Sequence, residues 1–208
     1  MAEFIPNLNI RRVDDVRYIG SLNGRYILAS RERRRDLSVK VFACRIKSIT
    51  PRRIVLAAPV SGARDEALTI QVNELGLIKA QIEDYLEFGF SAAIQADEDE
   101  RLKLAAKIEW VKKRTLYAWP DQREHRRVPP KNPQSRLILG DGTIMDCFLI
   151  DISRSGAAIS ADVAPKIGTP LAVGKVVCRV VRHLDVGFAV QFVETQDEDM
   201  VEELLAVA

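Results

Sequence analysis

The chain has 208 residues, enough for one or two domains that each bury a hydrophobic core. Its residues are 47% hydrophobic and 29% charged, which excludes wholesale disorder and collagen-like repeats and indicates a soluble globular protein. The formal net charge of +2 is too balanced for a general polyanion binder. No apolar run approaches the roughly 18 residues of a membrane-spanning helix, and the first ten residues do not resemble a secretion signal. We therefore expect a cytoplasmic protein without a membrane span.

An internal repeat organises the chain. The segment Cys44–Val60 aligns without a gap on Cys147–Val163, and Leu86–Ile94 aligns on Leu184–Phe192. A basic stretch accompanies each copy, at residues 31–53 and 112–136. The repeat predicts an N-terminal extension over residues 1–23, a first domain over 24–114 and a second, homologous domain over 115–208.

Short strands separated by turns are predicted in the first copy, and they are followed by a helix over residues 97–114. Leu104, Ile108 and Val111 follow one another at the i, i+4, i+7 spacing of a single helix face. Acidic residues come first in this segment and basic residues last, which suits the helix dipole.

A linker over residues 117–133, interrupted by four prolines, leads into the second copy. Gly140-Asp-Gly142 predicts a hairpin turn, and strands are predicted over Val176–Val181 and Gly187–Phe192. A shorter helix is predicted over 197–208. Because strands and helices do not alternate, the fold class is mainly all-β: two small antiparallel barrels, each followed by a helix.

The cysteines and histidines do not predict catalysis or metal binding. Cys44, Cys147 and Cys178 are widely spaced in apolar segments, so we interpret them as reduced core thiols. His125 and His183 have no cysteine or acid at ligand spacing, so no metal site is expected. Without a recognisable catalytic motif, we expect neither an enzyme nor a bound cofactor.

Two motifs in the second copy suggest ligand binding. Arg123 and Arg127 form an RxxxR pair, and Asp151-Ile-Ser-Arg-Ser-Gly156 is a DxSxxG sequence. RxxxR alone is expected by chance in a chain this rich in arginine, whereas [DN]xSxxG has about 0.05 expected occurrences at this composition. The ordinary interpretations are a solvated linker for the first motif and a turn between strands for the second.

Together the two motifs resemble the PilZ domain family, over Trp119–Val193 and more weakly over Gly24–Ala96. The resemblance implies six-stranded barrels, a cytoplasmic effector role without catalysis, and cyclic di-GMP as ligand. It implies that Arg123 and Arg127 clamp the ligand from the linker and that Asp151, Ser153 and Gly156 form the barrel side of the site. Gln122 and Arg126 are secondary candidates, and Gln122 stands where some relatives carry another arginine.

The chemistry of these residues agrees with that ligand. Arginine matches both phosphate oxygens and the O6/N7 edge of guanine, and a carboxylate such as Asp151 accepts from guanine N1–H and N2–H. Gly156 would let the backbone approach the ligand without a Cβ.

The first copy retains Arg31 and Arg35, but Ser48, Thr50 and Arg53 replace the three DxSxxG residues. We therefore expect no ligand there, and a role in packing, dimerisation or partner contact instead.

The resulting hypothesis is a tandem receptor in which ligand orders the linker and changes contacts with the other barrel or with a downstream protein. The alternatives are a small-barrel nucleic-acid-binding protein and a ligand-blind adaptor. A homodimer stays open, and no specific nucleic acid is expected.

Overall fold

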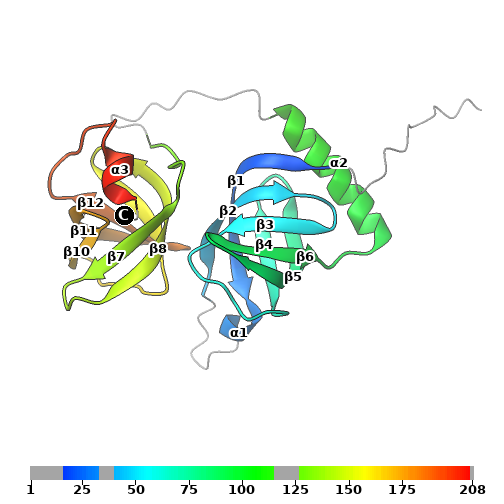
Figure 1. Cartoon of the computed structure of the whole chain (residues 1–208), viewed down its shortest axis with the longest axis horizontal. Helices are drawn as coiled ribbons and strands as arrows, with labels where there is room; N and C mark the ends of the chain where they lie inside the picture. The colour runs from blue at the N-terminus through cyan, green and yellow to red at the C-terminus, as the bar shows by residue number, and fades with distance from the viewer. Residues whose placement is uncertain (1–15, 33–39, 115–126, 207–208) are drawn as a thin grey trace, which may run out of the picture.

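The computed structural model describes residues 16–32, 40–114 and 127–206, which form two closed antiparallel six-stranded barrels (Figure 1). The first has the strand order β1-β2-β3-β6-β5-β4 and the second β10-β11-β12-β9-β8-β7. The strands of the first barrel are β1 (Tyr18–Leu28), β2 (Phe42–Ile49), β3 (Arg53–Ala57), β4 (Ala67–Val72), β5 (Gly76–Leu86) and β6 (Gly89–Ile94). Those of the second are β7 (Gln134–Leu139), β8 (Ile144–Ser153), β9 (Gly156–Ser160), β10 (Pro170–Val173), β11 (Val176–Leu184) and β12 (Gly187–Phe192). The predicted fold class is confirmed. Strand β1 begins at Tyr18, within the segment assigned to the N-terminal extension.

The two barrels share the register of their strands, which confirms the repeat. Ser48 pairs with Val55 as Asp151 pairs with Ala158, and both ladders carry a bulge one residue earlier. The hairpins β5–β6 and β11–β12 likewise correspond pair by pair, with bulges before Asp84 and Arg182. Each position in one barrel therefore has a defined counterpart in the other.

Alternating apolar side chains fill each barrel. In the first, the ring of Tyr26 packs against Phe42 and Phe90 at centroid distances of 5.5 and 5.7 Å. In the second, Phe188 and Val190 on β12 are buried. All three cysteines are buried free thiols, as predicted. The hairpin around Gly142 is also present, with the amide of Thr143 donating to the Asp141 carboxylate.

Helices close the ends of the barrels. Helix α2 (Glu98–Arg114) buries Leu104, Ile108 and Val111, as its periodicity predicts. Asp97 and Glu100 cap its start by accepting from each other's amides at 2.8 and 3.1 Å. Helix α1 (Ala29–Glu32) is a single turn. Helix α3 (Val201–Leu205) is shorter than the predicted 197–208, because a turn precedes it in which the amide of Met200 donates to the carbonyl of Asp197. No helix in the described ranges is long and apolar enough to cross a membrane.

The barrels meet along β2 and β3 of the first and β8 of the second. Ala43, Ala57 and Phe148 form a small apolar cluster between them. The Ala43 amide donates to the Ser160 hydroxyl, and Lys40 forms an ion pair with Asp162. This contact brings the start of the second domain beside the first barrel.

Candidate functional site

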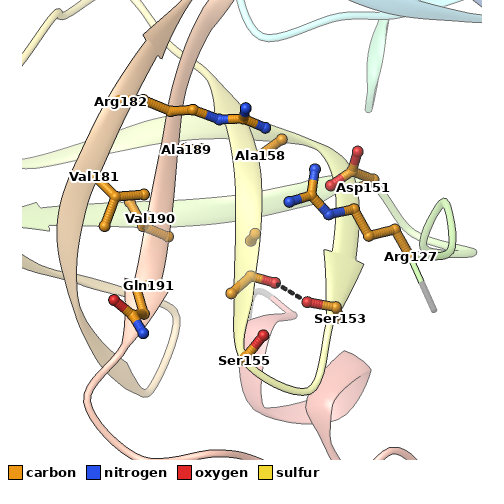
Figure 2. A pocket seen from close by; sticks show the side chains of 12 residues that line it. Arg127, Asp151, Ser153, Ser155, Ala158, Val181, Arg182, Ala189, Val190 and Gln191 are labelled. Carbon is orange, nitrogen blue, oxygen red and sulfur yellow. Dashed lines mark hydrogen bonds between the residues drawn. The ribbon is translucent and has the colours of Figure 1, made fainter. Parts of the chain in front are cut away.

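A pocket of about 270 Å³ opens on the outer wall of the second barrel (Figure 2). Its floor follows one cross-strand row: Asp151 on β8 pairs with Ala158 on β9, which pairs with Ala189 on β12, which pairs with Arg182 on β11. Opposed residues in such a row present their side chains on the same face of the sheet. Two small alanines thus separate Asp151 from Arg182 along the row and leave a hollow between them.

Asp151 and Ser153 reach the pocket from β8, and Gly156 begins β9 beyond the turn. The Ser153 side chain is buried, and its hydroxyl donates to the Gly156 carbonyl at 3.2 Å (Figure 2). That bond fixes the turn and leaves the hydroxyl oxygen as an acceptor. The structure therefore brings the three DxSxxG residues together around one hollow.

The packing of strands β9 and β12 in the second barrel explains why residue 156 is a glycine. A Cβ added here would lie 2.3 Å from the carbonyl oxygen of Val190 on the neighbouring strand β12. No real Cβ approaches a backbone oxygen so closely, so a larger residue would force the two strands apart. In the second barrel the need for glycine follows from the close approach of β9 and β12, whereas the first barrel holds Arg53 at the same register position.

Arg127 is the one described member of the linker motif, because Gln122, Arg123 and Arg126 lie outside the described residues. Reciprocal backbone hydrogen bonds of 2.9 Å join Val128 to Ile152 and hold this lead-in against β8. Figure 2 shows the Arg127 side chain directed at the pocket beside Asp151. The structure therefore places one arginine of the RxxxR pair next to the DxSxxG residues.

Arg182 is a pocket residue that sequence reasoning missed. It comes from β11, directly after the bulge, and its guanidinium extends toward Ala158 (Figure 2). Within residues 16–32, 40–114 and 127–206, neither Arg127 nor Arg182 forms an ion pair within 4.0 Å. The two guanidinium groups are thus available to an anion in the pocket. The repeat could have indicated Arg182, because its counterpart in the first copy is Asp84. A change from acid to base between the two copies marks a position where their functions differ.

The hollow continues toward the first barrel. A second, more open cavity of about 600 Å³ shares Arg127, Asp151 and Arg182 with the pocket. Its other wall includes Arg25 of β1, whose Nε donates to the Gln71 side chain at 2.8 Å. Sequence reasoning missed Arg25 as well, since nothing in its neighbourhood predicts contact with the other barrel.

In the first barrel, side chains of the barrel itself fill the surface that corresponds to this pocket. Arg53 stands at the position of Gly156, and its guanidinium contacts Glu83 at 3.1 Å and Asp84 at 3.0 Å. It also donates to the Ser91 hydroxyl at 2.8 Å. Arg64 also lies 3.3 Å from Asp84, so the first barrel carries two cations and two acids where the second has an open pocket.

No group of three or more histidine, cysteine or acidic residues suited to a metal ion occurs in the described part of the chain. The ring of His183 bonds the carbonyl of Pro165 at 2.8 Å. His125 lies outside the described residues.

Comparisons with known proteins match this chain to a family model and to solved structures. Residues 121–207 match the family model described as PilZ domain. Among solved structures, the Bacillus subtilis inhibitor of motility MotI/DgrA is 12% identical, with 90% of this chain and 94% of that chain covered and a TM-score of 0.29. The Borreliella burgdorferi PlzA protein in complex with c-di-GMP is 12% identical, with 88% and 85% covered and a TM-score of 0.25. YcgR from Escherichia coli in complex with c-di-GMP is 14% identical, with 88% and 80% covered and a TM-score of 0.27. No curated protein sequence matches the chain.

Proposed function

We propose, from the premise that residues 121–207 form a PilZ domain, that this chain is a cyclic di-GMP receptor whose second barrel binds the ligand. The observation that carries the proposal is the pocket in which Arg127 lies beside Asp151, Ser153 and Gly156. We expect Arg123, the other arginine of the RxxxR pair, to bind the ligand as well, with Gln122 and Arg126 as secondary contacts. The receptor carries out no catalysis and signals by changing its contacts.

The chemistry of the pocket supports this ligand class. Cyclic di-GMP presents two phosphates and two guanines, and arginine forks match either group. The carboxylate of Asp151 accepts from the N1–H and N2–H donors of one guanine, while Arg127 and Arg182, which both line the pocket, supply positive charge. The alanine floor admits a flat base against the sheet.

The proposed signal depends on the place of the linker in the sequence, between the two barrels. Residues 115–126 join the barrels and contain Arg123, so closure of the arginines on the ligand orders this segment. The ligand also faces the cavity wall that includes Arg25, so binding changes the contact between the barrels or with a downstream protein. Three buried free thiols suit a reducing compartment, and the proposed receptor acts in the cytoplasm.

Calorimetric titration of the full chain tests the proposal. Cyclic di-GMP should bind more tightly than GTP, GMP or duplex DNA. Each bidentate arginine contact is worth about 1–3 kcal/mol, so Arg127→Ala should weaken binding roughly 5- to 150-fold, and Asp151→Ala should weaken it comparably. Arg136→Ala and Asp146→Ala are matched controls, because both residues are exposed on β7 and β8 outside the pocket. Unchanged affinity in both pocket variants would show that this pocket is not the ligand-binding site.

A nucleic-acid-binding protein is the rival from another class. It would use both basic stretches on phosphates, and its affinity would fall steeply with salt. Tighter binding of random duplex DNA than of cyclic di-GMP, with such a salt dependence, would favour it. A chain that folds but binds neither would be the ligand-blind adaptor.

A further inference from the structure

Arg45 belongs to the first barrel but is buried against the second. Its side chain leaves β2 and is only 2% exposed. One terminal nitrogen donates to the carbonyl of Pro130, and the other donates to the carbonyl of Ile150 at 3.3 Å. The guanidinium also lies over the Phe148 ring, 5.8 Å from its centroid. All three partners belong to the second domain.

Both carbonyl acceptors adjoin the proposed ligand site. Pro130 lies in the lead-in three residues after Arg127, and Ile150 is the bulge residue directly before Asp151. The guanidinium of Arg45 therefore ties the segment that carries the pocket arginine to the strand that carries the pocket acid.

The lead-in is held from the opposite side by the second domain itself. The amides of Lys131 and Asn132 both donate to the carboxylate of Glu202 on α3. These bonds and the Val128–Ile152 bridge come from the second domain. Among the described residues, the first barrel contacts the lead-in through the hydrogen bond from Arg45 to Pro130.

The barrel fold does not require an arginine at this position. The counterpart of Arg45 in the second barrel is Phe148, so the same register accepts an apolar side chain. Burial lowers the pKa of the Arg45 guanidinium, an effect that the nearby carboxylate of Glu202 opposes. Among the described residues, its Nε has no hydrogen-bond partner. A buried cation that costs solvation and is not needed for packing indicates a role in the contact between the domains.

We infer that Arg45 is a positioning residue: it fixes the lead-in so that Arg127 faces Asp151, and it thereby makes the ligand affinity of the second barrel depend on the first. The inference rests on the proposed function for its ligand. Because coupling between binding and contact is reciprocal, ligand bound in the pocket in turn stabilises the contact between the barrels.

Full-length variants separate this role from general docking of the barrels. Arg45→Met keeps the stem of the side chain and removes the donors, and Arg45→Lys keeps the charge with a single donor group. Lys40→Met is the matched control, because it breaks the ion pair with Asp162 between the same barrels without touching the lead-in. Two measurements are made on each: the titration with cyclic di-GMP, and amide hydrogen exchange of Val128, Lys131 and Asn132 without ligand.

Arg45→Met loses two hydrogen bonds from a charged group, a loss that corresponds to about tenfold or more in an equilibrium constant. It should therefore weaken binding by about that factor and should speed exchange of the three amides. Arg45→Lys should give an intermediate loss, and Lys40→Met should change neither quantity more than about twofold. Equal losses in Arg45→Met and Lys40→Met, or unchanged exchange in Arg45→Met, would overturn the inference. If Arg45→Met does not melt cooperatively, Arg45→Lys decides by the same criteria. If the wild-type chain binds no cyclic di-GMP, the proposed function fails, and the exchange measurement alone decides whether Arg45 holds the lead-in.

Discussion

The Arg53 guanidinium lies 3.0 Å from the Asp84 carboxylate, and the two residues occupy the positions that Gly156 and Arg182 hold in the other barrel. Where the second barrel has glycine, the first has a cation, and where the second has a cation, the first has an acid that pairs with it. The pair fills the first barrel's counterpart of the pocket, where Glu83 also contacts Arg53 and Arg64 also contacts Asp84. The first barrel is therefore closed to a ligand by side chains that fill the space and already satisfy one another's charge.

The first prediction is that restoring the motif alone does not restore binding. In a chain whose own pocket is disabled by Asp151→Ala, the double change Ser48→Asp and Arg53→Gly should give no measurable titration with cyclic di-GMP. Glu83 then loses its cation, Asp84 keeps Arg64 at 3.3 Å, and the two acids no longer balanced by Arg53 repel the phosphates. Adding Glu83→Val and Asp84→Arg copies the second barrel and should give weak binding. Binding by the double variant as tight as by the quadruple one would contradict this account.

The sequence predicted the repeat, the barrels, helix α2 and the DxSxxG cluster, because each leaves a local pattern. Arg182 was missed for a physical reason. Strict alternation after Val180 would point Arg182 into the barrel, and the bulge at Val181 reverses this and turns it outward. Arg45 was missed because its position on a strand predicts a barrel residue, whereas its partners come from the other domain. Contacts that depend on register shifts or on docking leave no local pattern in one sequence.

The second prediction tests the newly found cation. Arg182→Ala should weaken cyclic di-GMP binding by about 1–3 kcal/mol without changing the melting temperature, because its side chain forms no hydrogen bond or ion pair among the described residues. Arg179→Ala, on the same strand and outside the pocket, is the control and should bind normally. Titration calorimetry checks both. Equal behaviour of the two variants would exclude Arg182 from the site.

The third prediction separates structure from ligand contact at Gly156. Gly156→Ala should lower the free energy of unfolding by about 1–3 kcal/mol, since the new methyl overlaps the Val190 carbonyl oxygen. Urea denaturation without ligand measures this loss. Ser155→Ala, in the same turn, is the control and should unfold like the wild type. A Gly156→Ala chain with unaltered stability and lost binding would assign the glycine to the ligand alone.

The last prediction concerns pH and the buried thiols of the second barrel. Burial raises the pKa of Cys147 and of Cys178 to about 12, although a hydrogen bond with Ser135 lowers that of Cys147 in part. The unfolded chain ionises these thiols near pH 8.5, so their contribution to stability is complete below that pH. It is lost progressively as pH rises toward 12, because the unfolded state then releases protons that the folded state keeps. A thiol reagent at pH 8 should therefore react slowly with the native protein and rapidly in denaturant. Urea midpoints should fall between pH 8 and 10.5, and less steeply in Cys178→Val. Fast reaction of the folded chain at pH 8, or a slope unchanged by Cys178→Val, would contradict the assignment.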